Sequence, residues 1–154
     1  MRTKTNGGNI MINNFDGEYR FLSNFANSKI IYEGIEYPTV EHAFQAAKTL
    51  DINQRKYIAS LRTPGEAKRA GRREVILRKD WEKVKDGIMY DLLKLKFENP
   101  VLREKLIATG NEPLEEGTTW HDNYWGNCYC DRCKNISGKN MLGILLMKVR
   151  SEIK

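Results

Sequence analysis

The sequence predicts an α+β domain that is mainly helical, with a small antiparallel sheet near the N-terminus. Apolar residues recur every three or four positions over most of residues 38–110 and again after residue 140, which is typical of amphipathic helices. The stretch KIIYEGIEYP, residues 29–38, instead has β-branched or aromatic residues on both sides of Glu33 and Gly34, as in a β-hairpin. The length of 154 residues suits one hydrophobic core.

The domain is expected to span residues 13–154. Residues 1–12, rich in Gly and Asn, are expected to form a flexible tail without the apolar segment of a secretion signal. The longest near-apolar run, residues 141–147, is far shorter than the ~18 residues that cross a bilayer. We therefore expect a cytoplasmic protein that does not bind membranes; the oligomeric state stays open.

Local start and stop signals set the predicted helices. Thr39, Asp51 and Thr63 are candidate N-caps, and Pro38 and Pro64 suit a first helical turn. The expected helices cover residues 38–50, 51–61, 63–71, 80–98, 100–110 and 140–153.

Residues 111–139 show no periodicity and are rich in Trp, Asn, Gly and Cys. A loop of this length in a compact domain is usually functional or disordered. Its aromatic residues argue against disorder, so we expect a functional loop.

The helix expected at residues 38–50 carries two kinds of side chain. An apolar stripe at helical spacing predicts burial of Val40, Ala43, Phe44 and Ala47. Beside it, about 100° around the helix, run Glu41, Gln45 and Lys48. This polar line faces either water or a pocket.

The net charge of +6 favours anionic partners such as phosphates or nucleic acid. Basic residues concentrate between Lys68 and Lys79. A solvated helix face is the plainer interpretation of this run, and a phosphate contact from one or two of its members is the alternative. The sequence contains no RNA-recognition motif, helix-turn-helix signature or pair of zinc fingers.

Three cysteines, Cys128, Cys130 and Cys133, lie within CYCDRC. They could bind zinc with His121 or an external group as the fourth ligand, or remain reduced thiols on a packed loop. The fourth ligand is uncertain, because the neighbouring Trp125 and Gly126 can direct His121 elsewhere. We therefore predict no metal and no other cofactor.

Candidate acids and bases fall in two places: Glu41 and His42 begin a helix, and Glu115, Glu116, His121 and Asp122 lie in the loop. Two carboxylates from distant parts of the chain, one of them beside aromatic residues, are what cleavage of a glycosidic bond would use. The plainer roles are an acid that complements the helix dipole, for Glu41, and a turn former, for Asp122.

Several motifs together resemble the NADAR family, the YbiA-like N-glycosidases, over about residues 14–152. In order they are FLSNF, GIEYPTVEHAFQAAK, TPGEAKRAGR, LRKDW, LKLKF, LIATGNEPLEE, WHDNYWG and GKNMLGILLMKVR. The resemblance implies hydrolysis of the C–N bond between a ribose and a base. In one branch the substrates are phosphorylated ribosylamino-pyrimidines of the riboflavin pathway; another branch removes ADP-ribose from guanine in nucleic acid.

The resemblance also implies site residues. Glu41, Lys48 and Asp122 match catalytic positions, and Asn24, Arg72 and Trp125 match substrate-binding ones, to which we add Gln45 and Gly126. We expect Glu41, Lys48, Asp122 and Trp125 to converge on one pocket. Lys48 either binds a phosphate or pairs with Glu41, or else attacks the sugar as a Schiff-base nucleophile.

Two features leave function open. Where the family often has a short glycine-rich piece after the WG pair, this chain has NCYCDRCKNISGKN, so the substrate stays uncertain. The alternative from another class is a non-catalytic module that binds ADP-ribose or nucleic acid. The presence of both Glu41 and Asp122 favours the enzyme, since a module that only binds an anion needs no carboxylates.

Overall fold

A computed structural model describes residues 3–6 and 9–154. The chain forms two compact units, one comprising Asn24–Asn99 and the other Met1–Ser23 with Pro100–Lys154. The elements are mainly helices, with small two-stranded sheets, as the sequence predicted.

The unit Asn24–Asn99 begins with the predicted hairpin. Strands β3 (Ile30–Tyr32) and β4 (Ile35–Tyr37) pair antiparallel, with Ile30 opposite Tyr37. Glu33 and Gly34 both have positive φ, 48° and 85°. Two such residues in a two-residue loop match the twist of the strands that they join.

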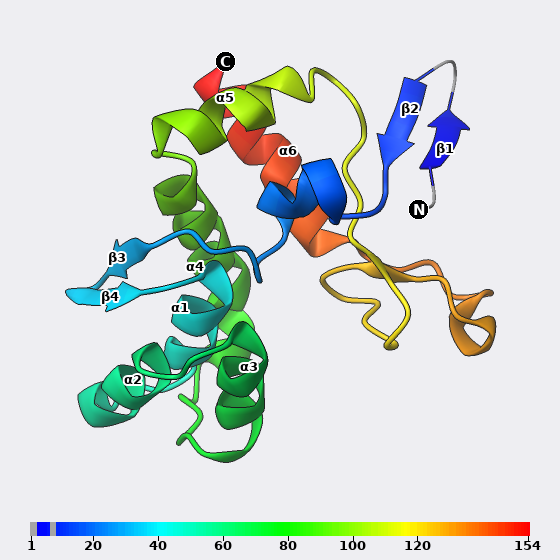
Figure 1. Ribbon diagram of the computed structural model, residues 1–154. Coiled ribbons are helices and arrows are strands. Elements are labelled where there is room, and N and C mark those ends of the chain that lie inside the picture. Colours follow the sequence, from blue (N-terminus) through cyan, green and yellow to red (C-terminus); the bar gives the residue numbers. More distant parts are fainter. Residues whose placement is uncertain (1–2, 7–8) are drawn as a thin grey trace. The chain divides into compact units, whose positions relative to one another are not determined.

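Four helices complete this unit, and α1 contacts the other three (Figure 1). The side chains of Thr39, Asp51 and Thr63 accept backbone N–H groups of the first turns, as predicted from their N-cap positions. The helices are α1 (Val40–Ala46), α2 (Ile52–Ala59), α3 (Pro64–Arg73) and α4 (Trp81–Lys96).

Helix α1 is shorter than predicted. It ends at Ala46 instead of near Leu50, and Pro38 precedes the Thr39 cap instead of lying in the first turn. The N–H groups of Lys48 and Thr49 donate to carbonyls only three residues back, and Arg55 Nε donates to the carbonyl of Thr49 at 2.7 Å. Local helix signals do not reveal such a contact.

The second unit begins with β1 (Thr3–Asn6) and β2 (Asn9–Ile12), which pair antiparallel. Residues 1–2 and 7–8 of the predicted tail lie outside the described residues, and the flexibility of residues 1–12 stays a prediction. The remaining elements are the 3₁₀ helices η1 (Gly17–Leu22) and η2 (Asp131–Cys133), the helices α5 (Pro100–Ala108) and α6 (Met141–Ile153), and the strands β5 (Gly117–Thr118) and β6 (Asn127–Cys128).

The long loop is ordered by pairing within itself. Strands β5 and β6 are parallel, with Thr118 opposite Cys128. Asn140 joins the loop to α6, because its Oδ1 accepts the N–H of Glu116 and its Nδ2 donates to the carbonyl of Leu114. The aromatic-rich segment therefore has a defined path, although it shows no periodicity.

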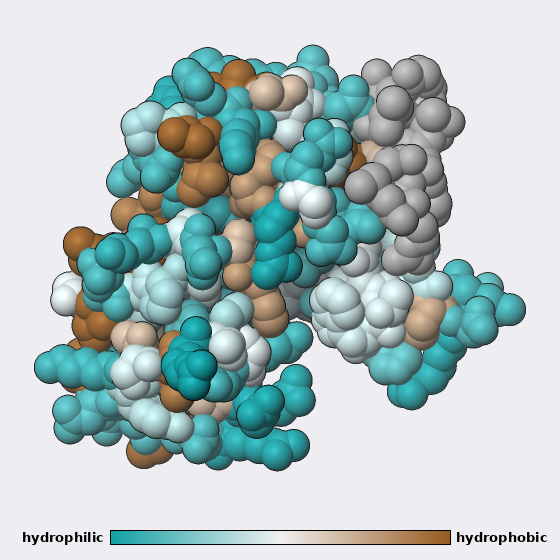
Figure 2. Space-filling model, viewed as in Figure 1, coloured by the Kyte–Doolittle hydropathy of each residue, from teal (hydrophilic) through white to brown (hydrophobic). Residues whose placement is uncertain are grey.

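The surface seen in Figure 2 is mostly hydrophilic, and its hydrophobic residues form small separate groups. None of the helices within residues 3–6 and 9–154 has the length and apolar character that a membrane span requires.

Candidate active site

Two of the three side chains in the predicted polar line, those of Glu41 and Gln45, lie on α1 and are buried. Glu41 and Gln45 are 7% and 5% exposed. Gln45 Nε2 donates a hydrogen bond to Glu41 Oε2 at 2.6 Å. Burying a carboxylate is costly unless it is hydrogen-bonded, so an ordinary solvated helix face does not account for this pair.

Helix α3 fixes the position of Gln45. A Cβ atom on Gly71 would lie 2.0 Å from Gln45 Oε1 and 2.8 Å from Gln45 Cβ. Only glycine permits this close approach of α3 to α1. Gln45, predicted to bind substrate, thus has a second role in this unit: its amide holds the Glu41 carboxylate.

Asn24 lies beside the start of α1, where its carbonyl accepts the N–H of Glu41 at 3.1 Å. Its side chain is 8% exposed, and Nδ2 donates to Met89 Sδ at 3.5 Å. Asn24 Oδ1 is buried and has no hydrogen-bond partner among the residues that the structure describes. A buried acceptor in this state is costly, and a ligand hydroxyl would satisfy it.

Lys48 is half-buried, one turn beyond Gln45. Desolvation lowers the pKa of its ammonium group; Glu41 opposes this shift, and the positive charges of Arg72, Lys68 and Lys85 add to it. A lysine amine with a lowered pKa is a better nucleophile at neutral pH. The neighbouring cations also suit a phosphate, and Arg72 itself is exposed on α3.

His42 belongs to the core of this unit. Its Nε2–H donates to the carbonyl of Leu61 at 2.9 Å, and the Thr39 hydroxyl, 2.8 Å from Nδ1, donates to that nitrogen. Burial lowers the pKa of His42 and favours the neutral ring. Both ring nitrogens are used, so His42 is a structural residue here.

In the other unit, Asp122 shapes the turn that carries Trp125. Asp122 Oδ1 accepts the backbone N–H groups of Tyr124 at 3.0 Å and of Trp125 at 2.9 Å. Trp125 is partly exposed and packs edge-on against Tyr124, with ring centroids 5.0 Å apart. Gly126 is buried, and a Cβ there would lie 2.3 Å from the carbonyl oxygen of Glu116. The turn-forming role of Asp122 is therefore present, whatever chemistry it adds.

Glu115 braces the loop. Its carboxylate accepts hydrogen bonds from the Tyr129 hydroxyl and from Asn127 Nδ2. Asn123, which the sequence analysis did not identify, also orders the loop, because its Oδ1 accepts the N–H of Cys128 at 2.9 Å. An asparagine in a turn is too common a signal to have identified it.

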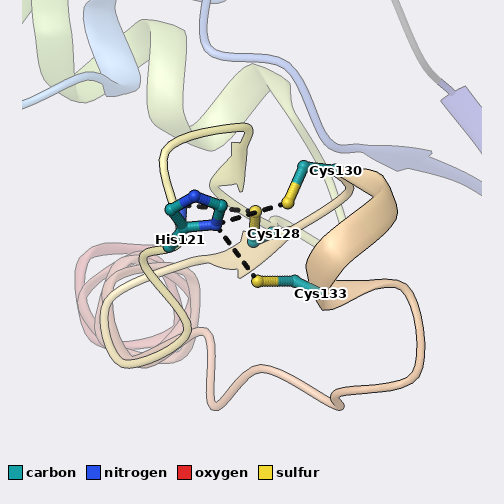
Figure 3. Close-up of side chains that lie close together, drawn as sticks. All are labelled: His121, Cys128, Cys130 and Cys133. Carbon is teal, nitrogen blue, oxygen red and sulfur yellow. Dashed lines mark hydrogen bonds between the residues drawn. The ribbon is translucent and has the colours of Figure 1, made fainter.

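The three cysteines and His121 face one another (Figure 3). His121 Nδ1 lies 3.4 Å from the sulfurs of both Cys130 and Cys133, and the His121 N–H donates to Cys128 Sγ at 3.3 Å. The four ligand atoms all lie within 4.8 Å of one another. The expectation that His121 would be directed away from the cysteines is therefore wrong, and with it the argument on which the prediction of no metal rested.

The candidate catalytic residues belong to different units. Asn24, Glu41, Gln45, Lys48 and Arg72 lie in Asn24–Asn99, and Asp122, Trp125 and Gly126 lie in the other unit. Within the first, Glu41 and Gln45 lie on α1, and Lys48 follows in the turn after it, near enough for the charge of Glu41 to act on its pKa. Their convergence with Asp122 and Trp125 on one pocket stays a prediction.

Comparison with known proteins identifies the family. The model of the NADAR domain matches residues 11–154. The chain is 43% identical over 138 residues to the N-glycosidase YbiA of Shigella flexneri serotype 5b, covering 88% of this chain and 82% of the relative. The NMR structure of the Escherichia coli protein YbiA superposes with a TM-score of 0.77 at 42% identity, covering 93% of this chain and 84% of that one.

A riboflavin biosynthesis protein of Vibrio vulnificus is 31% identical over 140 residues, which are 90% of this chain and 36% of that protein. The family expected from the motifs and the fold expected from the periodicity are both confirmed. The chain belongs to the NADAR domain family.

Proposed function

We propose that this protein is an N-glycosidase that hydrolyses the C–N bond between a phosphorylated ribose and its base. The observation that carries the proposal is the buried Glu41 carboxylate, which accepts a hydrogen bond from Gln45 on the same helix and lies near Lys48, a lysine of lowered pKa just beyond that helix. Similarity to N-glycosidases over 88% of the chain supports it. Similarity to the Vibrio riboflavin biosynthesis protein supports a ribosylamino-pyrimidine phosphate as the substrate.

Glu41 supplies the acid–base chemistry in this proposal. Cleavage of an N-glycoside requires a proton for the departing base and activation of the attacking water. The hydrogen bond from the Gln45 amide orients the Glu41 carboxylate for these proton transfers. Asn24 Oδ1, the buried acceptor beside the start of α1, would bind a ribose hydroxyl.

Lys48 takes the nucleophile's role. When the ribose ring of a ribosylamine opens, C1 becomes an imine. The neutral Lys48 amine adds to C1, its protons pass to the departing nitrogen, the C1–N bond to the base breaks to release the base as a neutral amine, and a Schiff base between Lys48 and the sugar remains. Water then hydrolyses it, which releases the sugar aldehyde and restores the amine. The lowered pKa of Lys48 supports this role over a phosphate or ion-pair role.

Arg72 binds the phosphate in this proposal. It follows Gly71, the residue that brings α3 against Gln45, and guanidinium groups recognise phosphate oxygens in pairs. We expect Arg72→Ala to raise the KM for a phosphorylated substrate more than it lowers kcat. An unchanged KM would return Arg72 to the solvated helix face.

Release of free base and reducing sugar tests the activity. The substrates to compare are a ribosylamino-pyrimidine phosphate, its dephosphorylated form and DNA carrying ADP-ribosylated guanine. Glu41→Gln should lower the rate by about 10²–10⁴-fold, whereas Glu98→Gln, an exposed glutamate after α4, should leave it unchanged. Binding without release from any of the three would favour the non-catalytic module.

A further inference from the structure

His121, Cys128, Cys130 and Cys133 form a cluster that the glycosidase chemistry does not use. Three thiols and one imidazole are the ligand set of structural zinc sites. We propose that these four residues bind one zinc ion as a closed Cys₃His site that holds the loop of residues 117–139 in place.

The spacing of the ligand atoms fits a tetrahedral ion. With Zn–S bonds of about 2.3 Å and Zn–N bonds of about 2.0–2.1 Å, ligand atoms of a tetrahedron lie about 3.5–3.8 Å apart. His121 Nδ1 lies 3.4 Å from Cys130 Sγ and from Cys133 Sγ, and all four atoms lie within 4.8 Å of one another. Small shifts of the side chains would bring all four to bonding distance.

Thiol hydrogen bonds account poorly for the same arrangement. His121 Nδ1 has one lone pair in the plane of its ring, yet two sulfurs lie at equal distances from it. One hydrogen bond would satisfy that lone pair, so a hydrogen bond to Nδ1 accounts for only one of the two sulfurs beside it. A single ion between them satisfies the nitrogen and all three sulfurs together.

The backbone is arranged around the same point. Cys130 precedes the 3₁₀ helix η2 and Cys133 is its last residue, and the N–H of Cys133 donates to the carbonyl of Cys130 at 3.1 Å. Both sulfurs lie toward the His121 imidazole (Figure 3). His121 has a φ of 68°, a conformation that histidine, like asparagine, adopts more often than most non-glycine residues.

The site would fix the loop that carries Asp122 and Trp125. His121 directly precedes Asp122, and Cys128 lies on β6, paired with β5. The Asn123 side chain connects the segment after Asp122 to β6, because its Oδ1 accepts the N–H of Cys128. Four protein ligands leave no position for substrate, so the zinc is structural.

Elemental analysis of the full chain, purified from zinc-supplemented cells without chelators, tests the proposal. We expect one zinc per chain. His121→Asn and Cys130→Ser should each lower zinc affinity by more than ~10-fold, since they remove a direct ligand. Asparagine tolerates positive φ, so His121→Asn keeps the backbone conformation. Ser137→Ala, an exposed position of the same loop, should retain zinc.

The absorption spectrum of bound Co²⁺ provides a second measurement, which does not depend on enzymatic activity. Co²⁺ added to the metal-free chain should give the intense visible bands of a tetrahedral site and the ultraviolet charge-transfer band of thiolate ligands, and zinc should displace it. Substoichiometric zinc, equal zinc in the ligand variants and Ser137→Ala, or a Cys130–Cys133 disulfide in the freshly purified chain would each overturn the proposal.

Discussion

Lys48 is the residue whose two possible roles are easiest to separate. Lys48→Arg keeps the positive charge but removes the amine that forms a Schiff base. We expect this variant to lose at least ~10²-fold in kcat, as removal of a nucleophile requires. Reduction with borohydride during turnover should attach the sugar to Lys48 of the wild-type chain.

The pH profile gives a further check on Lys48. Desolvation lowers its pKa from the free value of 10.5, so the neutral amine is present at lower pH than in an exposed lysine. Activity of a nucleophilic lysine should rise with pH up to that lowered pKa. A phosphate-binding ammonium would instead lose activity as pH rises through it, and Lys48→Arg would then remain active.

Arg55 is a buried cation that serves stability. Its Nε donates to the Thr49 carbonyl, and its guanidinium contacts Glu33 at 2.7 Å. Arg55→Ala should cost about 2–3 kcal/mol of unfolding free energy, because a buried carbonyl loses its donor and a cavity forms. Glu33→Gln should cost less than about 1 kcal/mol, since the Glu33 side chain is 55% exposed. Equal costs in urea unfolding would contradict this account.

At the scale of elements, the approach of α3 to α1 depends on Gly71. Gly71→Ala should destabilise the protein by about 1–3 kcal/mol, because the new methyl group overlaps Gln45. It should also lower kcat, because Gln45 orients Glu41. Gly65→Ala on the same helix is the matched control. The new Cβ would meet only Thr63 Oγ1, at 3.8 Å. The melting temperature of this variant should therefore be unchanged or slightly higher.

The long loop gives the second prediction at this scale, and it depends on the proposed zinc. Chelation should expose the bonds after Arg132, Lys134 and Lys139 to trypsin, because metal binding and local folding are coupled. Bonds within α4 should be cleaved at an unchanged rate, which serves as the internal control. Equal cleavage rates with and without a chelator would show that the loop does not need a metal.

Elements with local signals could be predicted from the sequence, and elements with distant partners could not. The caps Thr39, Asp51 and Thr63 act within three residues, so sequence spacing reveals them. The pairing of β5 with β6 depends on residues about ten positions apart in an aperiodic loop. Similarly, Glu41 stood out as a polar residue beside an apolar stripe, whereas the role of Gly71 became evident only from the packing of α3.

At the scale of the whole molecule, the candidate residues are divided between two units, one of which is formed by two separate stretches of the sequence. The family model spans residues 11–154 and so includes most of both. Neither unit alone contains the full set of residues that the family resemblance implies. We therefore expect activity to require the whole chain, and residues 24–99 alone to release no base from any substrate.

A double-mutant cycle tests whether Glu41 and Asp122 serve one reaction. If both act on the same transition state, Glu41→Gln and Asp122→Asn should be strongly non-additive, and the double variant should be little slower than the slower single variant. Because Asp122 Oδ1 also holds the turn at Trp125, asparagine is the suitable substitution: it keeps an acceptor oxygen there and removes the charge. Thermal unfolding of Asp122→Asn should therefore match the wild type. Additive losses in kcat with intact folding would mean that the two carboxylates contribute independently and do not act as one unit.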